Sequence, residues 1–205
     1  MSLRIYGIAR SRTFRNIWAA EEAGVPYEHV QVDFSETGCR APAFRGVNPN
    51  GKIPAIEDGD FKLWESMAIN LYIAKKYAPG RLYPADLAAE ARCWMWSFWV
   101  MTEVEPNALA FLYNTAIWEA AKRDPKAAAE GREKLGAPFA VLDQHLDATP
   151  CLLGEGFTVA DLNVASVLYS LRVFKFDFAP WPRIAAWLDL CLERPACLAA
   201  RKLRE

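Results

Sequence analysis

The stretch from Asn48 to Tyr77, NPNGKIPAIEDGDFKLWESMAINLYIAKKY, restricts the possible folds of this chain more than any other. It begins with a dense turn signal, Asn48 to Gly51, and continues with a short apolar run, Ile53 to Ile56. Asp58-Gly59 favours a two-residue hairpin turn before the alternating residues Phe61 to Trp64. The stretch therefore predicts a loop, a strand, a tight turn, a second strand and then a helix.

Pro54 stands inside the first of these strands. A proline there forfeits a ladder hydrogen bond and is tolerated only at an edge strand or at the first position. A trans proline that starts an edge strand is the ordinary explanation, because only about 5–6% of X–Pro bonds in folded proteins are cis. If the Ile53–Pro54 bond is cis, however, the chain turns sharply and leaves the main-chain N–H and C=O of Ile53 free for a ligand.

Glu65-Ser66 stands where the helix is expected to begin. Ser66 is a good N-cap, and most serines at such a position only cap the helix. A helix N-terminus also offers free N–H groups and partial positive charge, which suit the carboxylate of a ligand. A cis Pro54 beside such a terminus would hold a peptide-like acid by both its main chain and its carboxylate.

The strings NPNGKIPA and DGDFKLWES, followed by a helix, resemble the glutathione-binding half of the cytosolic glutathione transferases. The resemblance is dense over residues 48–77 and weaker over the rest of the chain. It is closest to serine-type, bacterial-like members, without assigning a class. The string GEGFTVADL (154–162) also resembles a family pattern that marks a buried helix of the second domain. There Thr158 and Asp161 form a variant of the capping box, which we interpret as a stability element rather than a site.

The residues before and after the stretch 48–77 predict two domains. A strand over 3–8, a helix over 13–23 and a strand over 27–34 form a parallel pair with a right-handed crossover. With the hairpin and helix already described, this gives βαβ followed by ββα, a thioredoxin-like α/β domain over residues 1–80. A linker rich in proline and glycine follows. Strand signals then vanish, which predicts an all-helical bundle domain over residues 86–205.

Composition excludes several kinds of partner. The 205 residues carry 24 basic and 25 acidic side chains, so no global positive field argues for nucleic acid. No apolar stretch reaches the ~20 residues needed to span a bilayer, and the N-terminus is unlike a secretory signal. Five scattered cysteines without C-x-x-C and two distant histidines suggest neither a disulfide framework nor a metal site. We expect a cytoplasmic protein with no metal, nucleic-acid or membrane partner.

A glutathione transferase must convert the thiol of glutathione into a nucleophile. A free thiol has a pKa near 8.5, so little of it is thiolate at neutral pH. Lowering that pKa by about two units requires about 2.7 kcal/mol of preferential stabilisation of the anion. One hydroxyl hydrogen bond and the positive end of a helix can supply this energy. The residue to look for is therefore a hydroxyl that donates to sulfur, not a base.

Three hydroxyls compete for this role near the end of the first strand. Ser11, with Arg15 four positions later, resembles the serine-type members and is our first choice. Tyr6 lies near the position of the tyrosine in tyrosine-type members, and Thr13 is the third candidate. A helix N-cap is the structural alternative for Ser11, and a backbone amide or no catalytic hydroxyl remains open. No cysteine lies between residues 8 and 14, which disfavours the cysteine-type relatives.

The resemblance assigns the glutathione contacts residue by residue. Ile53, before Pro54, would clasp the cysteinyl main chain of glutathione. Glu65 would pair with the γ-glutamyl ammonium, and Ser66 would hold the γ-glutamyl carboxylate. Lys52 would lie near the glycyl carboxylate, with an ordinary surface lysine as the alternative.

The second substrate is expected to bind in the helical domain. The aromatic residues over 94–101 are at helical spacing, which usually means core or subunit packing. Trp99, Tyr113 and Trp118 are the candidates for a wall of a hydrophobic-substrate site. The resemblance also implies a homodimer, in which an acid of the partner subunit often completes the γ-glutamyl site.

These features predict an enzyme of detoxification that attaches glutathione, its co-substrate, to small hydrophobic electrophiles or uses it to reduce peroxides. One alternative is a non-catalytic relative of the same fold that serves as a binding or assembly module. A second is a glutathione-dependent isomerase or dehalogenase. Ser11, Pro54 and the Glu65-Ser66 pair favour the enzyme, because a scaffold needs none of them.

Overall fold

The computed structural model describes residues 3–204 and divides them into two compact units. The first comprises residues 3–85 together with 193–204, and the second comprises residues 86–192. The sequence pattern placed the whole segment 86–205 in the helical domain. The division differs at its end, because the last helix, α10 (Pro195–Lys202), packs against α1 (Thr13–Ala23) of the first unit.

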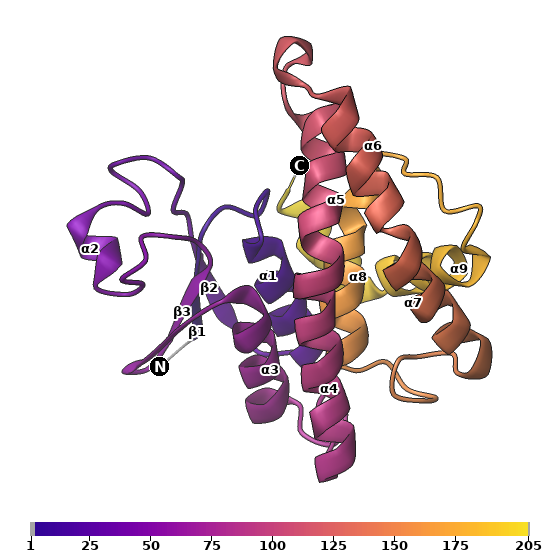
Figure 1. The fold of residues 1–205 in the computed structure, drawn as a ribbon. Helices are drawn as coiled ribbons and strands as arrows, with labels where there is room; N and C mark the ends of the chain where they lie inside the picture. Colours follow the sequence, from indigo (N-terminus) through magenta and orange to yellow (C-terminus); the bar gives the residue numbers. More distant parts are fainter. Residues whose placement is uncertain (1–2, 205) are drawn as a thin grey trace. The chain divides into compact units, whose positions relative to one another are not determined.

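The first unit is built on a four-stranded sheet of order β2-β1-β3-β4. Its remaining elements are β1 (Leu3–Tyr6), β2 (Tyr27–Val30), α2 (Pro42–Arg45), β3 (Ala55–Asp58), β4 (Phe61–Trp64) and α3 (Ser66–Tyr77). β1 and β2 are parallel, whereas β1 pairs antiparallel with β3 and β3 pairs antiparallel with β4. This confirms the predicted βαβ–ββα order of a thioredoxin-like domain. Figure 1 shows α1 and α3 on one side of the sheet and α2 on the other.

Successive side chains of β1 point to opposite faces of the sheet. Leu3 and Ile5 are fully buried, on the face that α1 covers. Arg4 and Tyr6 point to the opposite face, where the Tyr6 ring packs against Phe44 of α2 with ring centroids 5.9 Å apart. Side chains on the two faces of β1 therefore have different neighbours. Tyr6 points to the α2 face and not to the face that α1 covers.

The second strand is shorter than predicted. β2 ends at Val30 rather than Phe34 because the chain turns at Asp33. The Cys39 N–H donates to the carbonyl oxygen of Asp33 (2.9 Å), and the Asp33 carboxylate accepts the N–H of Ser35 (2.9 Å). These bonds replace the ladder that a longer strand would need.

The hairpin loop is also displaced by one residue. Asp58 pairs with Phe61, so the two loop residues are Gly59 and Asp60 rather than Asp58 and Gly59. Gly59 has a φ of 65°, a conformation that glycine adopts without steric cost.

Helices are the regular secondary structure of the second unit, residues 86–192, apart from one isolated bridge between Cys151 and Gly154. Its elements are α4 (Leu87–Trp99), η1 (Val100–Val104), α5 (Glu105–Leu112), η2 (Tyr113–Ile117), η3 (Ala120–Lys122), α6 (Pro125–Lys134), α7 (Gly136–Ala148), α8 (Val159–Val173) and α9 (Pro182–Leu192). Figure 1 shows α4 and α5 following one another almost in line, with α6 and α8 beside α5. The predicted all-helical character is confirmed. No helix in the described part of the chain is both long and apolar enough to cross a membrane.

The capping box at the start of α8 is formed as predicted. Asp161 is fully buried, and one of its carboxylate oxygens accepts the N–H and the hydroxyl of Thr158 (2.9 and 3.1 Å). The other oxygen accepts the N–H of Leu152 (2.8 Å) and the indole N–H of Trp187 on α9 (3.2 Å). Burial raises the pKa of Asp161, while these four hydrogen bonds act in the opposite direction. One side chain thus joins the start of α8, the preceding loop and α9.

Candidate functional site

The loop before β3 holds the Ile53–Pro54 peptide bond in the cis form. Asn48, almost fully buried, shapes this loop by donating to the carbonyl oxygen of Lys52 (2.5 Å) and accepting the N–H of Asn50 (3.0 Å). Among the described residues, the main-chain N–H and C=O of Ile53 have no hydrogen-bond partner. The loop therefore presents one unused peptide group beside the sheet.

The corner between β1 and α1 approaches this loop through Gly7. Gly7 has a φ of 134°, and a Cβ there would lie 2.1 Å from Thr13 Oγ1 and 3.1 Å from Ile53 Cβ. Only a residue without a side chain fits between them. The absence of that side chain brings the first turn of α1 next to the cis-proline loop.

Ser11 lies at this corner, two residues before α1 begins at Thr13. Its half-buried hydroxyl oxygen is 2.7 Å from the carbonyl oxygen of Ile8 and 2.9 Å from Thr13 Oγ1, and it accepts the N–H of Thr13 (3.1 Å). Two of the three predicted candidates, Ser11 and Thr13, therefore form one hydrogen-bonded pair. The pair stands at the positive end of α1, where an anion is stabilised.

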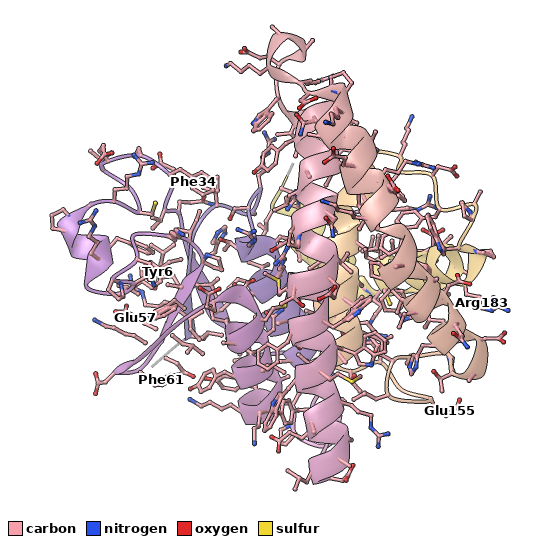
Figure 2. The ribbon with its side chains drawn as sticks, viewed as in Figure 1. Tyr6, Phe34, Glu57, Phe61, Glu155 and Arg183 are labelled. Carbon is pink, nitrogen blue, oxygen red and sulfur yellow. The ribbon has the colours of Figure 1, made fainter. Side chains whose placement is uncertain are left out.

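Tyr6, the third candidate, points elsewhere. Its hydroxyl donates to Glu57, and the guanidinium of Arg4 lies 5.1 Å from the centre of its ring. Burial, reinforced by the hydrogen bond to Glu57, raises the pKa of Tyr6 to about 12. Figure 2 shows Tyr6 and Glu57 on the side of the sheet that carries α2. Because its proton is already bound to a carboxylate, Tyr6 is poorly placed to donate to a thiolate beside α1.

A cavity of about 680 Å³ also lies on the α2 side of the sheet. Tyr6, Phe44 and Glu57 are among the residues that line it. Ser11, the cis-proline loop and the start of α3 are not part of its lining. Ile8, whose carbonyl oxygen bonds to Ser11, does line it, so the cavity adjoins the corner formed by Ser11 and Thr13 without including their side chains.

The start of α3 rules out the structural alternative for Ser66, in which it only caps the helix. Ser66 is the first helical residue, Glu65 occupies the cap position, and no side chain caps the terminus. Glu65 has a φ of 74°, which is uncommon for a residue other than glycine and costs about 1 kcal/mol or more. The first N–H groups of α3 are therefore left for an external acceptor.

Two buried side chains of α1 fix this terminus. Arg15 donates to the Ser66 hydroxyl oxygen (3.3 Å). Asn16 donates to the Ser66 carbonyl oxygen (2.8 Å) and to the side-chain oxygen of Asn70 (2.7 Å). The sequence pattern singled out Arg15 only for its spacing and did not single out Asn16. The signal that could have found both is a pair of polar residues on a helix that is otherwise buried over nearly its whole length.

These features suit a small charged peptide. The hydroxyl of Ser11 and the positive end of α1 suit an anion, the peptide group of Ile53 suits a main chain, and the N-terminus of α3 suits a carboxylate. The exposed Glu65 carboxylate is available for an ammonium, and Lys52 is exposed on the adjoining loop. Within residues 3–204, no cluster of three or more potential metal ligands is found.

Each of the three aromatic candidates of the second unit packs against another aromatic ring. The Trp99 ring packs edge-on against Trp96, with centroids 5.0 Å apart. Tyr113 and Trp118 pack against each other across the end of η2, with centroids 5.1 Å apart. Trp118 is exposed, whereas Trp99 and Tyr113 are half-buried.

Comparison with known proteins identifies both halves of the chain. The family model described as glutathione S-transferase, N-terminal domain, matches residues 1–75, and the model for the C-terminal domain of the same family matches residues 97–195. A probable glutathione S-transferase GSTF2 of Oryza sativa subsp. japonica is 31% identical over 95% of this chain and 93% of its own length. Glutathione S-transferase GstB of Escherichia coli (strain K12) is 34% identical over 86% of each protein.

Solved structures of glutathione S-transferases have the same fold as this chain. The theta class glutathione S-transferase of Xanthomonas axonopodis pv. citri, with glutathione bound, is 31% identical and superposes with a TM-score of 0.90 over 97% of this chain and 96% of that one. Glutathione S-transferase I from maize, in complex with an atrazine glutathione conjugate, is 29% identical, with a TM-score of 0.88 over 100% of this chain and 98% of that one. The resemblance noted in the sequence is thereby confirmed: the chain belongs to the glutathione S-transferase family, and it is an enzyme that transfers glutathione to electrophiles.

Proposed function

We propose that Ser11 activates glutathione by donating its hydroxyl hydrogen to the sulfur and stabilising the thiolate. The observation that carries this is the corner at which Gly7 lets Thr13 approach the cis-proline loop, with the Ser11 hydroxyl bonded to Thr13. A cysteinyl residue paired with the Ile53 peptide would place its sulfur beside this corner. The positive end of α1 adds to the stabilisation of the anion.

The same proposal assigns the rest of the tripeptide. The loop before β3 presents the unused peptide group of Ile53, which binds the cysteinyl main chain. Arg15 can only donate, so it occupies an acceptor position of the Ser66 hydroxyl and leaves the Ser66 hydrogen free for the γ-glutamyl carboxylate. Glu65 receives the γ-glutamyl ammonium, and Lys52 the glycyl carboxylate.

We expect the S66A and E65Q variants each to raise the KM for glutathione by about tenfold or more, because each removes a hydrogen bond to a charged group worth about 1.5–3 kcal/mol. Retention on immobilised glutathione should weaken in parallel. The matched control is D60N, which neutralises an exposed acid in the neighbouring hairpin loop. An unchanged KM in both variants would remove the start of α3 from the binding site.

The Y6F variant distinguishes Tyr6 at the end of β1 from Ser11 in the loop before α1 as the activating hydroxyl. We expect the pKa of bound glutathione and the turnover to stay within about twofold of the parent, because Tyr6 donates to Glu57 rather than toward α1. The free energy of unfolding should fall by about 1 kcal/mol for the lost hydrogen bond. The measurements are a pH–rate profile and urea unfolding. A raised thiol pKa in this variant would make Tyr6 the activating residue.

For the second substrate we propose small hydrophobic electrophiles, with reduction of organic peroxides as a further activity. The support is the aromatic character of Trp99, Tyr113 and Trp118 and the atrazine conjugate named for the maize relative. A glutathione-dependent isomerase or dehalogenase would share the first unit, and a panel of aromatic halides, epoxides and hydroperoxides distinguishes these activities.

We also propose that the enzyme is a cytoplasmic homodimer. α4 exposes four large apolar side chains, Leu87, Trp94, Met95 and Phe98, which suit burial against a second copy. The five cysteines are all free, as is typical of a reducing compartment. Two acids follow α4 closely, Glu103 and Glu105. Glu103 is exposed and Glu105 is buried, so we propose Glu103 as the acid that completes the site of a partner subunit.

A further inference from the structure

The hydroxyl of Thr13 has an unusual position for a residue in the first turn of a helix. Thr13 is fully buried, and among the described residues the one hydrogen-bond partner of its hydroxyl is Ser11 Oγ, 2.9 Å away. The N–H of Thr13 donates to the same oxygen at 3.1 Å. Two of the three neighbours of the Ser11 oxygen are thus supplied by Thr13, and the third is the carbonyl oxygen of Ile8 at 2.7 Å.

The direction of the hydroxyl bond follows from counting protons. Each hydroxyl has one hydrogen to donate and two lone pairs to accept with. The Ser11 hydrogen has an acceptor in the Ile8 carbonyl oxygen, which is close and cannot donate. If Ser11 donated to Thr13 instead, the Thr13 hydrogen would be buried without an acceptor, which costs free energy. The satisfied arrangement is Thr13 O–H to Ser11 Oγ, and Ser11 O–H to Ile8.

We infer that Thr13 is a positioning residue that makes Ser11 a donor only; this inference rests on the proposed role of Ser11. The N–H and O–H of Thr13 occupy both lone pairs of the Ser11 oxygen, so Ser11 cannot accept a hydrogen from the neutral thiol. The one bond left to it is O–H to sulfur. That bond is stronger to the thiolate than to the thiol, so it lowers the pKa of bound glutathione.

The rearrangement that this requires is small. When the sulfur binds, the Ser11 hydrogen turns from the Ile8 carbonyl oxygen to the sulfur, and the thiol hydrogen leaves to solvent. The Ile8 oxygen remains satisfied, because the main-chain N–H of Ser11 also donates to it at 3.0 Å. Gly7 contributes the space, since a Cβ there would lie 2.1 Å from Thr13 Oγ1.

The test replaces Thr13 with valine, which removes the hydroxyl and keeps the shape of the side chain. We expect T13V to raise the pKa of bound glutathione by about half to one unit, read from thiolate absorbance and from the pH profile of kcat/KM. At neutral pH, kcat/KM should fall about threefold to tenfold, with the KM for glutathione little changed, because Thr13 is fully buried and is not among the residues proposed to hold the tripeptide. T13S should restore the pKa. The matched control is T37V, which removes a threonine hydroxyl 3.1 Å from Ser35 Oγ in the exposed turn after β2.

The parent, T13V and S11A together distinguish the possible failures. An unchanged pKa in T13V beside a raised pKa in S11A overturns the inference about Thr13 and leaves the role of Ser11 intact. An unchanged pKa in S11A overturns the proposed role of Ser11 itself. A purely structural role for Thr13 would change the thermal midpoint and the folded fraction but not the pKa. Should T13V not fold, T13A removes the same hydroxyl and carries the same expected pKa.

Discussion

Replacing Ser11 with alanine is expected to lower kcat for conjugation by about 10- to 100-fold at neutral pH. A hydrogen bond to a charged group contributes about 1.5–3 kcal/mol, which corresponds to a rise of about one to two units in the pKa of bound glutathione. The KM for glutathione should change little, because the proposed contacts of the tripeptide are with the cis-proline loop and the start of α3. The measurements are the thiolate absorbance of the binary complex and the pH dependence of kcat/KM.

The pH profile determines whether the loss in S11A is one of thiol activation. If Ser11 acts by lowering the thiol pKa, the rate of S11A should rise with pH over a higher range than that of the parent. The ratio of the two rates should then shrink as the pH exceeds both pKa values. A constant ratio at every pH would instead indicate a defect in positioning. The control is S35A, which removes an exposed serine hydroxyl from the turn after β2.

S11A also removes an acceptor from the first turn of α1. The Thr13 N–H and hydroxyl both donate to Ser11 Oγ, so a loss of about 0.5–2 kcal/mol in the free energy of unfolding is expected alongside the kinetic effect. Rates must therefore be expressed per folded molecule. A variant that keeps the parental rate and thiol pKa would reject Ser11, and Y6F, measured in parallel, would then show whether Tyr6 is the donor.

Local signals in the sequence were sufficient for most of the first unit. Gly24 ends α1 in the left-handed conformation (φ 68°), as a glycine after an apolar helical pattern predicts. The turn, hairpin and helix of 48–77 follow in the predicted order because each depends on residues close in the chain. The capping box of α8 is likewise local, with Thr158 and Asp161 three positions apart.

Features that depend on distant residues could not be predicted. The placement of α10 on α1 includes an ion pair between Arg194 and the buried Glu22, 172 positions apart. No pattern within either segment indicates this pairing. Likewise, the partner of Tyr6 is decided by the register of β1 on β3, which brings Glu57 opposite Arg4.

Distant contacts also explain why Ser66 does not cap α3. Serine before an apolar helix is a strong local cap signal, and glutamate rarely adopts a positive φ. Here Glu65 takes that conformation, and Ser66 moves into the helix, where Arg15 and Asn16 of α1 bond to it. Contacts between two helices outweigh the local preference, and they do so at the proposed glutathione site. Strain of this kind is common at binding sites.

Replacing Asp161 with alanine is expected to lower the free energy of unfolding by about 3–5 kcal/mol without changing turnover per folded molecule. The variant leaves the N–H groups of Leu152 and Thr158 and the indole N–H of Trp187 without their acceptor, and each buried unsatisfied donor costs about 1–3 kcal/mol. It also removes the reciprocal half of the capping box. Urea unfolding measures the free energy, and kcat/KM divided by the folded fraction measures turnover.

Two further variants show that the loss comes from the buried acceptor rather than from charge. D161N keeps one acceptor oxygen in nearly the same shape, so its loss should fall between that of D161A and the parent. D189A removes an acid from an exposed pair with Arg172, whose side chains are 44% and 41% exposed, and should cost less than about 1 kcal/mol. If D161A kept the parental free energy of unfolding while its turnover fell, Asp161 would have a catalytic rather than a structural role. Within the described part of the chain, the Asp161 carboxylate bonds to the start of α8, the preceding loop and α9, which indicates a structural role.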